Sequence, residues 1–175
     1  MADRVWVSSN GGPLLLLPVA HLAEWHGTDA AAQEPSDADD PPSDYDRACA
    51  VADYTGVVPV GSGEGLVLGD EPNDTAWVAL ARGGILVRWV YADGAEQAEA
   101  ALASIPPDLA WGSAGTFRVT ASPVELFDSA ESGANALSER FRIDLAAGTY
   151  EIAHADYRPD ADTWLQLIRL RCAVT

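Results

Sequence analysis

The sequence has no lysine, only two cysteines and three histidines, and no long apolar run. Cys49 and Cys172 lack the spacing of a zinc or redox motif, so we interpret them as buried small apolar residues. No apolar stretch approaches the roughly 18 residues that a membrane span needs. The stretch near the N-terminus is interrupted by Gly11-Gly12-Pro13 and does not read as a signal peptide. We therefore expect a cytoplasmic protein that does not cross a membrane.

Positive charge is also scarce, because the chain has ten arginines against 27 acidic residues, which gives a formal net charge of −17. A phosphate backbone is held by a positive surface, so a nucleic acid is not an expected partner. A basic protein is a better match, since opposed charges steer and accelerate an encounter. The acidity also fits a general role in solubility, and both interpretations stay open at this stage.

Recognised catalytic and cofactor motifs are missing as well. There is no Gly-x-Ser-x-Gly elbow and no zinc-type ligand spacing. Glu24 and His26 are badly spaced to share a helical face with His21, so we expect no metal site there. The glycines at 61, 63 and 65 suggest a phosphate loop, but an apolar run follows them where such a loop would open a helix. The sequence therefore predicts neither a metal nor a cofactor.

The stretch from Val57 to Tyr91 holds three or four apolar runs rich in β-branched and aromatic residues, each bounded by Gly, Pro, Asn or Asp. This pattern predicts a meander of strands. In the last run Ile85, Val87 and Trp89 share one face at period two, and the opposite face is also partly apolar. We expect that strand to be central and covered on both sides.

The remaining segments extend this pattern in both directions. Further strands are expected at Arg4–Ser8, Leu14–Leu17, Leu109–Trp111 with Phe117–Thr120, Val124–Asp128, Arg140–Leu145, Thr149–Ala155 and Thr163–Ala173. Helical spacing and capping signals predict helices within Val19–Trp25, Ser43–Tyr54 and Ala95–Ile105. These elements predict an α+β, mainly β protein in which antiparallel sheets pack as a sandwich with two or three short helices. A length of 175 residues fits one domain over residues 1–175.

Residues 28–42 interrupt this series of elements. They contain three prolines, five acidic residues and no aromatic or large aliphatic side chain. Such a segment cannot bury enough apolar area to offset the entropy of ordering it. We expect a mobile acidic loop within the single domain.

Several carboxylates fall in or beside the turns of the meander, namely Asp53, Glu64, Asp70, Glu71 and Asp74. Binding groups commonly lie on loops that flanking strands hold in place, so Glu64, Asp70, Glu71 and Asp74 are the candidate partner-binding residues. A carboxylate pair could instead perform acid–base chemistry or bind a divalent cation, as in a small hydrolase. Turn carboxylates also commonly cap backbone amides without any partner.

Several stretches of the chain resemble a known family. They are WVSSNGGPLLLLP at Trp6–Pro18, the segments Ser43–Pro72 and Gly83–Asp93, ELFDSA at Glu125–Ala130 and the hairpin at Gly148–Ile152. In order and spacing they resemble the immunity protein 21 family of bacterial polymorphic toxin systems. The resemblance implies an antitoxin that is not an enzyme and that protects the producing cell by binding the effector domain of a cognate toxin. A basic effector such as a nuclease would match the acidic charge. A non-catalytic β-sandwich module that binds a small ligand is the other alternative to this function.

Overall fold

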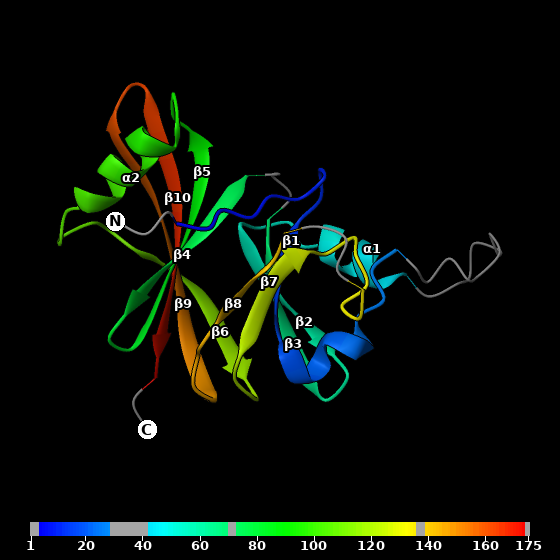
Figure 1. The fold of residues 1–175 in the computed structure, drawn as a ribbon. Helices are drawn as coiled ribbons and strands as arrows, with labels where there is room; N and C mark the ends of the chain where they lie inside the picture. Colours follow the sequence, from blue (N-terminus) through cyan, green and yellow to red (C-terminus); the bar gives the residue numbers. More distant parts are fainter. Residues whose placement is uncertain (1–3, 29–41, 70–72, 136–138, 174–175) are drawn as a thin grey trace. The chain divides into compact units, whose positions relative to one another are not determined.

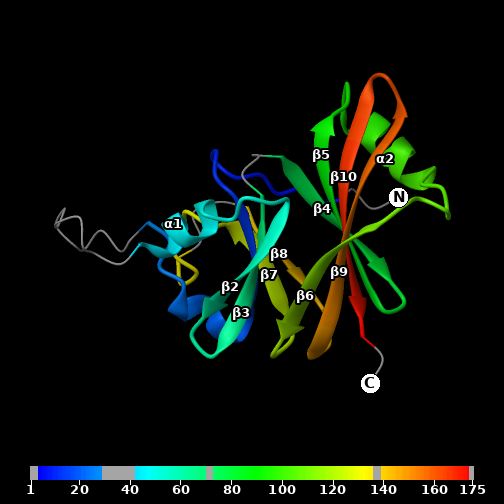
Figure 2. The ribbon, with the colours of Figure 1, turned by 180° about the vertical axis from the view of Figure 1, so that it is seen from behind.

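The computed structural model describes residues 4–28, 42–69, 73–135 and 139–173, and Figures 1 and 2 show its fold from opposite sides. The chain forms two compact units, each assembled from segments that are distant in sequence. Unit 1 comprises Met1–Trp6, Asn73–Thr116 and Tyr150–Thr175, and unit 2 comprises Val7–Pro72 and Phe117–Thr149. Because the segments of the two units alternate along the chain, the single domain over residues 1–175 remains compatible with them and stays a prediction.

Unit 2 contains a five-stranded antiparallel sheet with the order β2-β3-β1-β7-β8. The strands are β1 (Leu14–Pro18), β2 (Thr55–Val60), β3 (Gly63–Leu68), β7 (Val124–Asp128) and β8 (Phe141–Ile143). In the centre of the sheet Leu15 of β1 pairs with Val67 of β3 and with Phe127 of β7. All three side chains are fully buried, so this sheet has a closed apolar core.

Two short helices belong to unit 2, the 3-10 helix η1 (Val19–Glu24) and the helix α1 (Asp44–Cys49). The Ser43 hydroxyl accepts a hydrogen bond from the backbone N–H of Asp46, and the Asp46 carboxylate accepts one from the backbone N–H of Ser43. This reciprocal capping box satisfies amide donors at the first turn and explains where α1 begins. Trp25 follows η1 and is fully buried in the core.

Unit 1 is built around the second antiparallel sheet, with the order β4-β5-β10-β9-β6. The strands of this sheet are β4 (Asp74–Leu80), β5 (Gly83–Tyr91), β6 (Gly112–Val119), β9 (Gly148–Asp160) and β10 (Thr163–Cys172), and the helix of unit 1 is α2 (Ala95–Ala103). The last residues of β6 and the first two of β9 are assigned to unit 2. Val87 of β5 and Leu167 of β10 pair across the sheet, and both are fully buried on the face that α2 covers. Strand β5 is therefore an interior strand, as its two-sided pattern predicts.

The predicted fold class is confirmed: the described structure is mainly β, with two antiparallel five-stranded sheets and three helices. One strand prediction is wrong, since within Arg4–Ser8 only Val7 makes an isolated bridge. Residues Leu109–Trp111 also lie outside the strands, because β6 begins at Gly112. The expectation of buried cysteines is wrong as well, since Cys49 is exposed and Cys172 is half-buried. The meander is divided between the units, with the β2–β3 hairpin in one sheet and the β4–β5 hairpin in the other.

Two further expectations concern mobility and membranes. Residues 29–41 of the expected acidic loop lie outside the described residues, so that loop stays a prediction. Within the described ranges, none of the helices has the length and apolar character that crossing a membrane would take.

Candidate functional site

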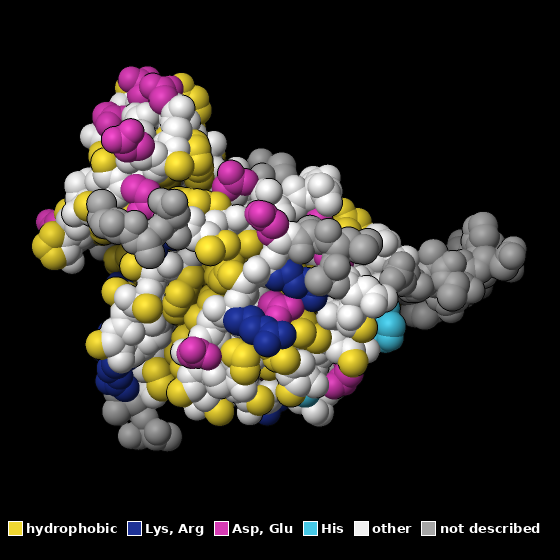
Figure 3. All heavy atoms as spheres, viewed as in Figure 1, with side chains coloured by type: hydrophobic (Ala, Val, Ile, Leu, Met, Phe, Trp, Pro, Cys, Tyr) yellow, Lys and Arg dark blue, Asp and Glu magenta, His cyan; other side chains and the backbone are white. Residues whose placement is uncertain are grey.

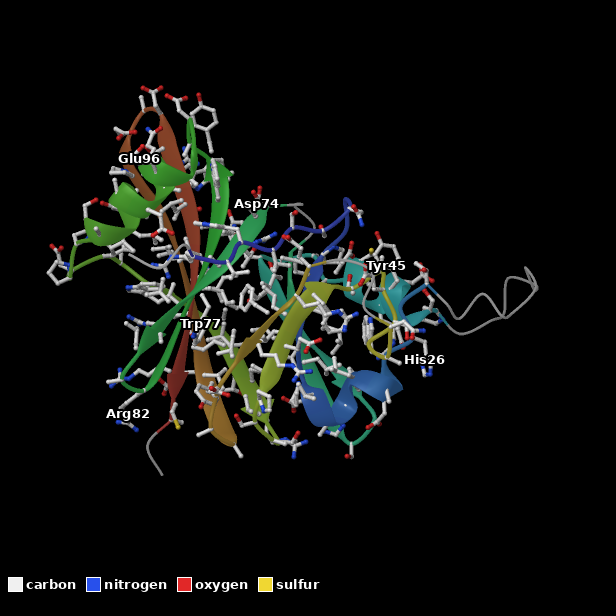
Figure 4. The ribbon with its side chains drawn as sticks, in the orientation of Figure 1. His26, Tyr45, Asp74, Trp77, Arg82 and Glu96 are labelled. Atoms are coloured by element: carbon white, nitrogen blue, oxygen red, sulfur yellow. The ribbon has the colours of Figure 1, made fainter. Side chains whose placement is uncertain are left out.

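The predicted carboxylates are found in both units. Asp70 and Glu71 lie outside the described residues. Glu64, on β3 of unit 2, accepts a 2.9 Å hydrogen bond from the backbone N–H of Arg118 and lies 3.8 Å from its guanidinium. Asp74 is the first residue of β4 in unit 1 and pairs with Trp89 of β5 (Figure 4). Glu64 therefore already has a partner within its own unit, whereas Asp74 is half-buried at the start of a strand.

The histidine cluster also has partners within unit 2. The Nδ1 atom of His21 lies 2.8 Å from Glu24 Oε1, and its Nε2 atom lies 2.9 Å from the Thr120 hydroxyl. The prediction that Glu24 is badly spaced to share a helical face with His21 is therefore wrong, since the two residues are three apart and pair within η1. His21 is buried, and both its ring nitrogens are occupied by protein atoms. Among residues 4–28, 42–69, 73–135 and 139–173, no group of three or more His, Cys, Asp or Glu side chains could hold a metal ion.

Asp44 connects the start of α1 to the segment after η1. Its carboxylate accepts hydrogen bonds from the backbone N–H of His26 at 2.7 Å and from the guanidinium of Arg47. Partial burial raises the pKa of Asp44, but these hydrogen bonds outweigh that effect and hold the pKa below its ordinary value of 3.8. The contact fixes a local turn and leaves little of the carboxylate for chemistry on a substrate.

An ion network joins β7 to β8 and to the residue before β8 in the sheet of unit 2. The Glu125 carboxylate on β7 accepts hydrogen bonds from Arg140 Nη1 at 3.0 Å and from Arg142 Nε at 2.8 Å. The guanidinium of Arg140 also lies over the Phe127 ring, 4.8 Å from its centroid. Arg140 further donates to the backbone carbonyls of residues 132, 133 and 135. The network thus ties the segment after β7 to the sheet, and its carboxylate is paired on both oxygens, which indicates a structural role.

An apolar groove lies in unit 1, beside α2. Alanine at positions 98 and 101 lets this helix approach the sheet closely, and both side chains pack into the core that contains Val87 and Leu165. The N-terminal turn is held by Gln97, which accepts from the backbone N–H of Asp93 at 2.9 Å and donates to the Thr163 hydroxyl at 2.8 Å. The C-terminal end is held by the Tyr157 hydroxyl, which donates to Ser104 O at 2.8 Å. The helix is therefore fastened at both ends and forms a fixed wall.

Between this wall and the first two strands lies a groove of about 620 Å³. Its floor is made by Val78 and Leu80 of β4 and by Ile85 and Val87 of β5, which share one face of the sheet. The wall is made by α2 and the residues after it, with Glu96, Glu99, Ala100, Leu102, Ala103 and Ile105. Val87 is fully buried, but Leu80 is 49% exposed, so the groove opens toward the edge strand β4. We call this feature the α2 groove.

The polar groups of the α2 groove are arranged on its rim. Arg4 donates from Nε to Glu99 at 2.8 Å and from Nη1 to the carbonyl oxygen of Trp77 on β4 at 2.8 Å. A guanidinium is thus already held between a carboxylate of the helix and a backbone carbonyl of the edge strand. Glu96 lies one turn before Glu99 on α2 and is exposed, and among the described residues it has no ion pair.

Exposed carboxylates are concentrated at one end of the strands of unit 1, where Arg158 is exposed as well. Figure 3 shows acidic side chains over α2 and over the turn between β9 and β10, where Asp93, Glu96, Asp160 and Asp162 are exposed. Arg82 lies in the β4–β5 turn, at the other end of the strands (Figure 4). The α2 groove begins at the acidic end, so an incoming cation meets carboxylates there.

A match to a family model supplies the functional context for this arrangement. The model described as immunity protein 21 matches residues 5–163, which span both units and include the whole of α2 and of the β4–β5 hairpin. No curated protein and no solved structure matches the chain. Because the match covers most of the 175 residues, the chain belongs to the immunity protein 21 family.

Proposed function

We propose that this protein is the antitoxin of a bacterial polymorphic toxin system and that it neutralises the effector domain of its cognate toxin by binding it in the cytoplasm of the producing cell. The observation that carries the proposal is the family match over residues 5–163. Inhibition by binding needs a surface and no catalytic machinery. The described carboxylates and histidines fit this, since Glu64, Glu125, Asp44 and His21 are each paired within the protein.

The charge of the chain supports a basic partner. A net charge of −17 favours approach of a positive surface and raises the rate of encounter more than the final affinity. A nuclease fits this description, because its substrate groove is itself positive. The proposed acidic surface contains Asp70, Glu71 and Asp74, with Glu64 nearby in sequence. Glu64 contributes least in this proposal, since Arg118 already neutralises part of its charge.

Co-expression tests the function directly. The probe is the C-terminal domain of the secreted protein encoded next to this gene, expressed in a sensitive cell with and without the present chain. We expect growth to be restored by the wild-type protein and a complex of the two proteins to be recovered by affinity purification. Continued growth arrest, with the immunity protein folded and in excess, would contradict the proposed function.

Charge reversal tests the acidic surface. Replacing Asp70, Glu71 and Asp74 by Arg should slow association with the toxin domain about tenfold or more and flatten its salt dependence. The matched control reverses the exposed residues Glu139, Asp144 and Glu151, which changes the net charge equally. If both triple variants slow association alike, total charge explains the effect and the proposed surface is wrong.

A further inference from the structure

We infer that the α2 groove is the anchor site for the toxin, and that it takes a segment in which apolar side chains stand next to an Arg or Lys. This inference rests on the proposed function and names a surface that the acidic residues of the β3–β4 connection do not include. The groove belongs wholly to unit 1, since every residue that lines it lies in that unit.

The size and lining of the groove favour apolar side chains as its contents. A volume of about 620 Å³ lies within the range of roughly 300–1,000 Å³ that is typical of binding pockets. Val78, Leu80 and Ile85 keep part of their surface in water, although the core beside them is fully buried. Covering aliphatic surface of this kind is favourable at about 25 cal/mol per Å². The groove is smaller than a whole protein interface, so it serves as an anchor within a larger contact.

The rim indicates the charge of the occupant. Arg4 already fills the position between Glu99 and the carbonyl of Trp77, with both contacts at 2.8 Å, so a cation of the toxin must be attracted by the other carboxylates of the rim. Glu96 offers a second carboxylate one turn earlier on the same side of α2. Asp93, Asp160 and Asp162 extend this acidic end, and together these groups favour a cation and repel an acidic segment. A toxin segment with a basic residue beside its apolar ones matches both the floor and the rim.

The fixed position of α2 adds to this argument. A site that is already formed loses less conformational entropy on binding than one that must be assembled. Gln97 and Tyr157 hold the two ends of the helix, so the distance between the wall and β4 is set before any partner arrives. The edge position of β4 leaves the groove open on that side, where Leu80 is 49% exposed.

The test fills the groove without disturbing the core. Ala100 is exposed on α2 and lines the groove, so Ala100→Arg places a long charged side chain in it at small cost in helix propensity. We expect binding of the toxin domain to weaken about tenfold or more, with an unchanged melting temperature. Ala95→Arg adds the same charge at an exposed position of the same helix outside the lining, and it should bind like wild type. Equal binding by the two variants would overturn the inference while leaving the proposed function in place.

A second measurement does not require the toxin. Methyl resonances of Val78, Leu80 and Ile85 are followed by NMR while a synthetic peptide of alternating Leu and Arg is added, and then a peptide of alternating Leu and Glu. We expect shifts with the first peptide only, and their loss in Ala100→Arg. If the wild-type chain fails to bind the toxin domain, the proposed function fails and this experiment still decides the chemistry of the groove. Absent shifts, or shifts that persist in Ala100→Arg, would overturn the inference.

Two rival occupants give distinct results. Self-association through the groove would appear in analytical ultracentrifugation as a dimer that Leu80→Ser abolishes, and this outcome would overturn docking of a toxin segment. A small apolar ligand would shift the same three methyl groups at low micromolar concentration with no preference for a basic peptide, and would overturn it too. A monomer that responds only to the basic peptide supports the inference.

Discussion

The two units cover their sheets to different extents. In unit 2 the central side chains Leu15, Val67 and Phe127 are fully buried, together with Trp25. In unit 1 Val87, Leu165 and Leu167 are equally buried beneath α2, but Val78 and Ile85 at its side remain partly in water. A nine-residue helix rich in alanine is too narrow to cover the face of five strands. The difference separates a core that stabilises the fold from a sheet face that is free to contact a partner.

The largest effect on stability is expected from a cavity in the fully buried core of unit 2. Trp25→Ala removes a fully buried indole and its 2.9 Å hydrogen bond to Ser129 O. We expect a loss of about 3–5 kcal/mol in the free energy of unfolding, measured by urea denaturation, because a large cavity remains. Trp164→Ala, at a half-buried position under Arg158, should cost far less and serves as the control. Equal costs would show that burial of Trp25 in the closed core does not set the cost of its removal.

The buried ion network should give the next largest effect. Glu125→Gln removes the nearer of two counter-charges of the buried Arg140 and leaves it only Glu131 at 3.4 Å, and we expect a loss of about 3 kcal/mol in the free energy of unfolding. Arg142 is 65% exposed, so Arg142→Ala should cost at most about 1 kcal/mol. A small cost for Glu125→Gln, close to that of Arg142→Ala, would show that the network does not stabilise unit 2.

Trp89 offers an intermediate case in unit 1. It lies on β5 at the margin of the core, and its ring meets Trp6 edge to face at 5.8 Å. Because Trp89 is only partly buried, we expect Trp89→Ala to cost about 2 kcal/mol, less than Trp25→Ala. A double-mutant cycle with Trp6→Ala should give a coupling of about 1 kcal/mol. A cost above that of Trp25→Ala would reverse the ranking of the two cores.

The smallest expected effect depends on pH and concerns Asp44. Its lowered folded-state pKa means that its contribution to stability is present above about pH 3.8 and is lost as the pH falls through the folded value. Asp44→Asn should therefore be less stable than wild type at pH 7, and the gap should close below pH 3.8. Asp53→Asn removes a charge from an exposed position and controls for net charge. A gap that stays constant down to pH 3 would contradict the role of Asp44.

Local signals in the sequence predicted the elements better than their partners. Val124–Asp128 has the predicted bounds, and Ser43 begins a helix as its capping pattern indicates. The division of the meander between two sheets was not predictable, because periodicity of two identifies a strand but not its neighbours. The same limit explains Arg4–Ser8, where Trp6 packs through its ring on Trp89 without a ladder of backbone hydrogen bonds.

The candidate site shows the same limit more strongly. Turn carboxylates such as Asp74 are visible in the sequence, but the α2 groove is formed by residues from separate segments. Glu99 faces Arg4 from almost a hundred residues away in the chain, and neither residue carries a motif. The available signal in the sequence was an apolar strand that ends at Leu80, together with an alanine-rich helix. This signal identifies a groove only once the pairing of β4 with β5 is known.

The way the chain alternates between the units has a consequence for its synthesis on the ribosome. Unit 2 has all its strands once β8 has emerged, whereas the sheet of unit 1 needs β10 between β5 and β9. Until β10 is translated, the β4–β5 hairpin exposes an unpaired strand edge, and α2 lacks Leu165 and Leu167 as packing partners. A nascent chain released before β10 would therefore present an aggregation-prone hairpin. A truncated product should be cleared by proteases instead of accumulating as a folded fragment.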